Sequence, residues 1–265
     1  MRGWAICCAV ALFGRGAAAL AADEQPICAD RPGKATSACT VPKGHWQVET
    51  GLADWTLHKA DGERDTSLVL GDTTIKYGLT SRSDIEIGVT PWKRITSSGL
   101  GFRERASGFG DLNVMYKQAL TGADSPVQVV AMPYVKVPTA KRSLGNGKWD
   151  GGLVVPIGYA LPRTPFSIGL APEVDWVADA DGHGHHAGMV QVATLGWAAT
   201  GKLSLSAEIW GQWDWDPSGT TRQASADTSA AYLISNDVQL DAGANFGLNK
   251  ATPDVEVYGG ISKRF

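Results

Sequence analysis

The sequence lacks the features that mark several common protein classes. After the first two dozen residues no segment approaches 18 uninterrupted apolar residues, which argues against a transmembrane helix. Charge of one sign is not concentrated either, because 24 Lys+Arg stand against 27 Asp+Glu and the net charge is −3. No basic cluster therefore points to nucleic acid as a partner. Amphipathic helical periodicity is almost absent as well.

The first 22 residues (1–22) are predicted to be a secretory signal peptide. Arg2 gives the positive start, residues 4–13 form an apolar stretch, and residues 17–22 are small, as at a cleavage site. We expect cleavage near Ala21 or Ala22. Export would place the mature chain in an oxidising compartment.

Cysteine is scarce in the mature chain. Cys7 and Cys8 lie within the predicted signal peptide, which leaves Cys28 and Cys39. An even pair in an exported protein predicts one disulfide, closing a short loop near the mature N-terminus. A metal site is the alternative, but only His45 is near enough in sequence to add a further ligand.

What the sequence contains from Trp46 onward is period-two alternation of apolar and polar residues, with 32 glycines and 10 tryptophans in the chain. The predicted strands are long enough to cross a bilayer at a tilt. They are 46–57, 66–78, 83–96, 109–120, 126–138, 148–161, 165–178, 186–199, 202–215, 222–235, 237–248 and 254–265. The fold class is predicted as all-β, a membrane-spanning antiparallel up-and-down barrel of about 12 strands covering residues 46–265.

The last predicted strand has the pattern of a closing barrel strand. Val257, Ile261 and Phe265 share one face, while Glu256 and Arg264 share the other. A terminal aromatic residue on an alternating strand is typical of outer-membrane barrels, so Phe265 is predicted to be the membrane-insertion terminus, recognised by the barrel-assembly machinery. A terminal strand of a soluble sandwich is the alternative.

Connection lengths favour the membrane barrel. Tight turns are predicted at 80–82, 122–125, 162–164, 201 and 236. The intervening connections, at 58–65, 97–108, 139–147, 179–185, 216–221 and 249–253, are mostly longer and more polar. Short periplasmic turns alternating with long extracellular loops are typical of bacterial outer-membrane barrels. We therefore predict a location in a Gram-negative-type outer membrane, in contact with its lipids.

If the apolar face meets lipid, the polar face lines the lumen. The lumen-lining candidates are Glu86, Arg94, Lys117, Lys136, Glu173, Asp175, Glu208, Asp227, Asp241 and Glu256, and the same face carries Glu49, Lys76, Asp111 and Asp214. Acids outnumber bases, which would favour passage of cations. The alternative is that these charges pair across a narrow lumen and brace the wall; the two interpretations are compatible.

The segment 23–45 has two open interpretations. It could fold into the barrel as a plug, with Arg31, Lys34 and Lys43 meeting the acidic wall. It could instead remain a periplasmic cap or tail, which is the interpretation we favour from sequence.

The run from Asp179 to His186 holds three of the five histidines. His183, His185 and His186 with nearby aspartates are candidate ligands for a divalent metal. A polar extracellular loop is the favoured alternative, so no metal or other cofactor is predicted. An enzyme is not predicted either, since no strand sets a His facing a Ser and G-x-S-x-G is absent.

Several segments also resemble a known family. They include IKYGLTSRSDIEIGVTPW (75–92), GFGDLNVMYKQAL (108–120), KWDGGLVVPIGYALP (148–162) and QLDAGANFGLNKATPDVEVYGGISKRF (239–265). These are similar to a family of bacterial outer-membrane proteins labelled transporter-like, or as the outer-membrane component of a phenol meta-cleavage pathway. The resemblance implies an outer-membrane barrel for passage of small molecules and supplies no catalytic residues.

The predicted function is a channel or transporter for small, aromatic or hydrophobic solutes. The alternative is a non-conducting barrel that is structural or displays extracellular loops for binding.

Overall fold

Alternating sequence forces an extended chain with two unlike faces, and the structure contains such strands almost throughout. The computed structural model describes residues 25–265, so the predicted signal peptide lies outside the described residues. The strand segments are β1 (Trp46–Ala60), β2 (Glu63–Thr80), β3 (Ser83–Val89), β4 (Trp92–Gly99), β5 (Phe102–Gly108), β6 (Leu112–Ala119), β7 (Val127–Val137), β8 (Asp150–Val154), β9 (Ile157–Ala160), β10 (Phe166–Ala178), β11 (His185–Ala198), β12 (Leu203–Asp216), β13 (Gly219–Ser235), β14 (Val238–Gly247) and β15 (Val255–Arg264).

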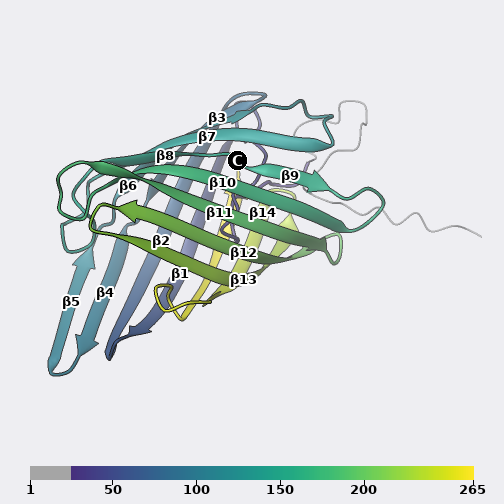
Figure 1. Cartoon of the computed structure of the whole chain (residues 1–265). Coiled ribbons are helices and arrows are strands. Elements are labelled where there is room, and N and C mark those ends of the chain that lie inside the picture. Colours follow the sequence, from purple (N-terminus) through teal and green to yellow (C-terminus); the bar gives the residue numbers. More distant parts are fainter. Residues whose placement is uncertain (1–24) are drawn as a thin grey trace, which may run out of the picture.

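These segments form one closed antiparallel barrel (Figure 1). Closure is shown by β1, which pairs with β2 on one side and with β15 on the other. Over the described residues the segments make 12 barrel strands, because β3–β4, β5–β6 and β8–β9 each continue one strand across an interruption. The predicted all-β barrel and its strand number are confirmed.

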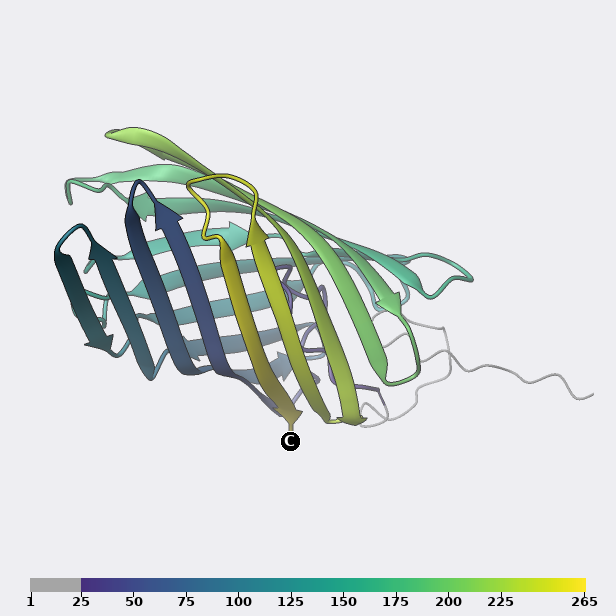
Figure 2. The same cartoon turned by 90° about the horizontal axis from the view of Figure 1, so that it is seen from below.

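Three predicted long loops are wrong, because strands extend through them. Residues 58–65 belong to β1 and β2, joined at Asp61 and Gly62 with φ of 52° and 86°. Positive φ at both central residues gives the tight hairpin turn that Asp-Gly favours. Likewise β4 and β5 extend through 97–108, and β12 and β13 through 216–221. The hairpin tips lie at the end of the barrel opposite the C-terminus (Figure 2).

Two predicted continuous strands, 83–96 and 148–161, are interrupted instead, at Pro91 and Pro156. A third break, at 109–111, separates β5 from β6 at the start of the predicted strand 109–120. Proline has no N–H to donate to a ladder, which explains the breaks after β3 and β8. The Pro156 carbonyl still accepts a hydrogen bond of 2.9 Å from the Val130 amide, so the two halves of that strand stay attached to β7.

The barrel buries polar side chains and exposes apolar ones. Lys76, Lys117 and Glu86 are each at most 2% exposed, whereas Ile85 and Ile87 beside Glu86 are 38% and 41% exposed. This inversion of the soluble pattern is what a lipid-facing wall with a polar interior requires. The described residues contain no helix long and apolar enough to cross a membrane.

Exposed aromatic side chains gather near both ends of the wall. At the end of the short turns they are Trp46, Tyr116, Phe166, Trp197, Tyr232 and Phe265. Toward the other end they are Phe109, Trp149, Trp176, Trp215 and Phe246. Two such bands match the interfacial aromatic girdles of membrane barrels.

Candidate functional site

Residues 25–44, here called the inner segment, lie inside the barrel. Figure 2 shows this purple segment between the C-terminal strands and the strands of the far wall. The segment contains no strand; its side chains bond to β2, β6, β13 and β14, and its backbone amides bond to β1 and β12. Only a chain within the lumen can reach strands on all of these sides. The contacts of the inner segment therefore lie on the inner face of the barrel wall.

Asp30 forms the first anchor of the inner segment. Its carboxylate pairs with Lys76 of β2 and lies 2.7 Å from Nζ of Lys117 of β6. Glu86 lies behind the two lysines, with Oε1 at 3.6 and 3.7 Å from their Nζ atoms. Burying an ammonium group without a partner costs free energy. The Asp30 carboxylate therefore stabilises the two buried lysines of the wall, and these lysines in turn hold the inner segment.

Glu49 of β1 holds the backbone next to this anchor. Its Oε2 accepts hydrogen bonds from the Asp30 and Arg31 amides, at 3.0 and 3.1 Å. Its Oε1 lies 2.6 Å from Nζ of Lys76. A single buried carboxylate thus fixes both the path of the inner segment and the charge of the wall.

Arg31 forms the second anchor. Its guanidinium makes two hydrogen bonds to Asp241 of β14, of 2.9 Å from Nη2 and 3.3 Å from Nε. The guanidinium lies 5.9 Å from the ring centroid of Tyr258 and packs against Gly260. A Cβ at Gly260 would lie 2.5 Å from Nε of Arg31, so a side chain there would displace the paired arginine.

Lys34 forms the third anchor. Its amide donates a 2.8 Å hydrogen bond to Glu208 of β12, and its Nζ lies 3.3 Å from Asp227 of β13. The same Nζ donates to Ser225 and lies 4.4 Å from the Trp210 ring centroid. Lys43, which we expected to contact the acidic wall beside Arg31 and Lys34, is exposed.

A disulfide between Cys28 and Cys39 closes the loop that contains all three anchors. The predicted pairing is confirmed.

A cavity of about 190 Å³ lies between the inner segment and one side of the wall. The wall side is lined by small residues of β9 to β13, including Gly158, Ser167, Gly169, Gly196, Ser206, Ser229 and Ala231. The opposite side is formed by the inner segment, where Ile27, Ala29, Pro32, Ala35 and Ala38 line the cavity together with Asp30, Arg31, Thr36 and Ser37. Small side chains on this part of the wall leave the space that larger residues would fill.

The predicted lumen residues fall into three groups. Glu86, Lys117, Glu208, Asp227 and Asp241 are buried around the inner segment. Asp175 accepts a 2.6 Å hydrogen bond from Tyr134, and Glu256 accepts one of 2.6 Å from Asn245. Lys136 pairs with Asp150 at 2.6 Å, and Glu173 is half-buried beside β8.

Arg94 is placed differently from the others. Arg94 of β4 pairs directly with Leu68 of β2, and Leu68 pairs with Trp55 of β1. Trp55 in turn pairs with Val257 of β15, which is exposed on the outer surface. Directly paired residues share a face, so Arg94 faces outward and its lumen assignment is corrected. The continuous alternation that we assumed for 83–96 is broken at Pro91, which is why the sequence placed it wrongly.

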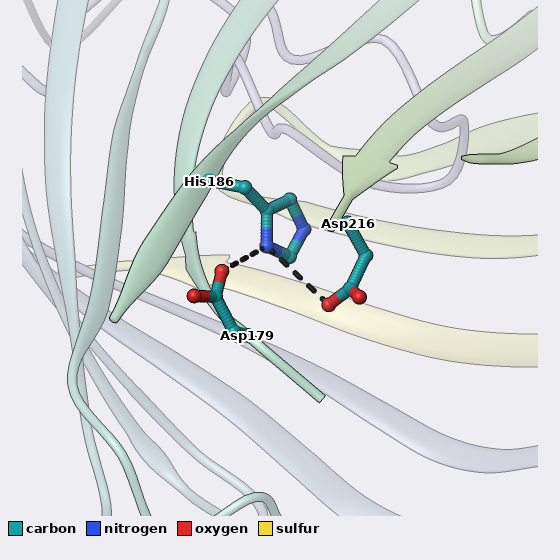
Figure 3. Close-up of side chains that lie close together, drawn as sticks. All are labelled: Asp179, His186 and Asp216. Atoms are coloured by element: carbon teal, nitrogen blue, oxygen red, sulfur yellow. Dashed lines mark hydrogen bonds and ion pairs between the residues drawn. The ribbon is translucent and has the colours of Figure 1, made fainter. Parts of the chain in front are cut away.

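The histidine-rich run is dispersed by the fold. Only His186 joins the carboxylates: its Nδ1 lies 2.8 Å from Asp179, and its Nε2 lies 2.8 Å from Asp214 (Figure 3 draws the former). Asp216 is 3.5 Å from Nδ1. His185 instead stacks on Trp176 with ring centroids 3.5 Å apart. His183 is exposed in the loop.

The resulting cluster joins the 179–184 loop to the end of β12. One ligand atom each from Asp179, His186 and Asp216 lies within 4.8 Å of the others, a donor set that suits a divalent transition metal. When the imidazole is protonated, the same contacts form an ion-pair clasp with Asp179 and Asp214. Sequence proximity suggested His183 and His185 as partners, whereas the structure supplies Asp214 and Asp216 from the neighbouring strand.

Asp30 and Trp210 are the main site residues that sequence reasoning missed. Asp30 lies inside the Cys28–Cys39 loop next to Arg31. An acid adjacent to two bases in a disulfide-closed loop was the available signal. Trp210 is one of several tryptophans on β12, and nothing local distinguishes it from its neighbours.

Residues 29–265 match the family described as "Putative MetA-pathway of phenol degradation". The chain belongs to this family. No curated protein matches the sequence.

Solved structures share the fold of this family member. The COG4313 outer membrane channel from Pseudomonas putida F1 is 18% identical with a TM-score of 0.68, covering 89% of this chain and 99% of that one. The NanC porin is 10% identical with a TM-score of 0.51, covering 82% and 98%. The transport unit of the autotransporter AIDA-I from Escherichia coli is 10% identical with a TM-score of 0.50, covering 83% and 89%.

Proposed function

We propose that this protein is an outer-membrane channel through which small apolar molecules, of the size of one aromatic ring, pass by diffusion. The cavity between the inner segment and the small-residue wall carries this proposal. A cavity of about 190 Å³ is comparable with the roughly 150 Å³ of apolar space that accommodates benzene in another protein. The family description names phenol degradation, and a related fold carries the printed name of an outer membrane channel.

In this proposal the inner segment narrows the lumen, and its anchors keep it seated. The acidic wall is largely neutralised by Arg31, Lys34, Lys76 and Lys117, so charge pairing braces the wall around the segment. The remaining path runs along the cavity beside β9 to β13. A lining that is mostly small and apolar would admit uncharged rings more readily than ions.

Export and assembly complete the proposal. Residues 1–22 would act as the signal peptide, and the C-terminal strand with Phe265 would be recognised by the barrel-assembly machinery. Outer-membrane lipids and small solutes are the proposed partners, and no catalytic step is assigned.

The experiment fills the cavity and leaves the anchors intact. Ser229 lines the cavity, whereas its neighbour Thr228 is exposed on the outer face. In liposomes containing the purified barrel, Ser229→Leu is expected to slow phenol entry at least fivefold, and Thr228→Leu to leave it unchanged. Phenol flux would be followed by absorbance after rapid mixing, with protein-free liposomes supplying the background.

Two results would reject the proposal. Phenol entry equal to that of protein-free liposomes would favour the non-conducting alternative. Phenol entry that is as fast in Ser229→Leu as in Thr228→Leu would show that phenol does not pass through the cavity.

A further inference from the structure

The outward face of two long hairpins has an unusual charge distribution. The hairpins are β1–β2 and β4–β5, whose strands pair side by side through β2 and β4. Asp54 of β1 pairs with Tyr258, which lies near Arg31 inside the barrel, so Asp54 faces inward. The next residue, Trp55, and its partners Leu68 and Arg94 therefore face outward.

Every second residue from the row of Trp55, Leu68 and Arg94 toward the hairpin tips also faces outward. They are Trp55, Leu57 and Lys59 on β1; Arg64, Thr66, Leu68 and Leu70 on β2; Trp92, Arg94, Thr96 and Ser98 on β4; and Arg103, Arg105 and Ser107 on β5. The charged members are Lys59, Arg64, Arg94, Arg103 and Arg105, here called the basic face. All five are bases, and no acid shares their face.

The opposite face of the same hairpins has the opposite charge. Asp54, Glu63, Asp65 and Glu104 lie there with two basic residues, Lys93 and His58. The hairpins thus contain both signs but separate them by face. A hairpin that only needs solubility would mix the signs, because adjacent opposite charges stabilise cross-strand pairs and adjacent like charges destabilise them.

The bases of the basic face are available for an external partner. Lys59, Arg64, Arg103 and Arg105 are exposed. Within residues 25–265 none of the five takes part in an ion pair, and the guanidinium of Arg94 lies over the Trp92 ring at 4.8 Å. Five unpaired cations on one face repel one another unless anions lie between them.

The position of the basic face along the strands identifies the anion. Trp55, Leu68, Leu70 and Trp92 lie nearer the barrel body, and most of the bases lie nearer the tips. An aromatic and apolar row below a cationic row matches the order of acyl chains and anionic headgroups across a membrane interface. The tips are at the end opposite the short turns, which is the extracellular end in bacterial barrels.

We propose that the basic face binds the phosphate groups of phosphorylated lipids in the outer leaflet of the outer membrane. Arginine suits this role, since its planar guanidinium donates paired hydrogen bonds to phosphate. The lipid contact would fix the tilt and height of the long hairpins at the membrane surface. It is independent of whether solutes pass through the lumen.

The test compares two matched double variants of the full-length barrel in detergent micelles. Arg103→Gln/Arg105→Gln removes two cations of the basic face, and Arg163→Gln/Lys202→Gln removes two exposed cations at the short-turn end. The probe is purified bisphosphorylated lipid A, with the same lipid after phosphatase treatment as the phosphate-free probe. Binding is measured by native mass spectrometry at two salt concentrations.

The expected loss is about fivefold in lipid A affinity for each cation removed, so roughly 25-fold for Arg103→Gln/Arg105→Gln. The control variant should bind as the unmodified protein does, and 10 mM inorganic phosphate should not displace the lipid. Equal binding of phosphorylated and phosphate-free lipid would overturn the proposal. So would an equal loss in both variants, or displacement by free phosphate alone. Heat-modifiable mobility of each variant verifies that the barrel is folded.

Discussion

At the scale of single residues, the interior depends on charges that are buried and shared. The Asp30 carboxylate forms ion pairs with two lysines. The Glu49 carboxylate pairs with one lysine and accepts hydrogen bonds from two backbone amides. Such groups are stable only together, because removing one partner leaves an uncompensated buried charge. The sequence showed acids in excess along the inner face; the balancing bases come partly from the inner segment.

The titration of Asp30 gives a prediction about pH. Burial alone would raise the pKa of this carboxyl, but Lys117 and Lys76 outweigh burial and hold the pKa well below its usual range. A depressed pKa stabilises the seated segment above the ordinary carboxyl pKa near 4, and that stability is lost as the pH falls through the depressed value. We expect the inner segment to stay seated from pH 5 to 8 and to be released only in stronger acid.

Trp210 fluorescence can follow this release, since its ring contacts Lys34. Asp30→Asn is the matched variant: it should lose about 3 kcal/mol of seating free energy at pH 7 and should lack the acid transition. A transition of the unmodified protein centred near pH 6, or one that persists unchanged in Asp30→Asn, would contradict this role.

At the scale of elements, local signals located the strands but misjudged their ends. The Asp61-Gly62 dipeptide is a hairpin signal that a polar, charged context concealed. Pro91 and Pro156 interrupt strands that alternation alone makes continuous. The interruption at Pro91 also changed the face of Arg94, which is a consequence of a side-chain period of two.

The Cys28–Cys39 disulfide acts at this scale, because it shapes the whole inner segment. Closing a loop of this length is worth about 3 kcal/mol in the chain-entropy model. Reduction should therefore increase trypsin cleavage after Lys34 at pH 8, while the barrel keeps its heat-modifiable mobility. In Cys28→Ser/Cys39→Ser cleavage should be fast with or without reductant. Protection that is equal in the oxidised and reduced protein would show that the ion pairs alone hold the segment.

At the scale of the whole molecule, the barrel closes where its first strand pairs with its last. Trp46 and Phe265 exchange backbone hydrogen bonds of 3.2 and 2.8 Å where β1 meets β15. The Phe265 side chain adds nothing to the lumen, as it is 61% exposed and lies beneath Lys263 on the outer surface. Its proposed role is therefore in assembly rather than in the stability of the finished barrel.

Phe265→Ala tests that division of roles. Backbone pairing survives the substitution, so the barrel refolded in detergent should keep its melting temperature within a few degrees. In cells, the heat-modifiable form in the outer-membrane fraction should fall several-fold, with Val255→Ala on the same face as control. If Phe265→Ala assembles in cells as well as the unmodified protein, the terminal ring is not part of the insertion signal.

The sequence by itself determined the all-β class, the strand number, the disulfide and the orientation of most side chains. These follow from local rules, since a period of two assigns each residue to a face without reference to distant strands. Only the tertiary structure decided that residues 25–44 lie inside the barrel and that Asp214 meets His186. It also decided that five bases form one outward face. Those arrangements depend on the register between strands and on the space left inside the closed wall, and both arise only when the first strand pairs with the last.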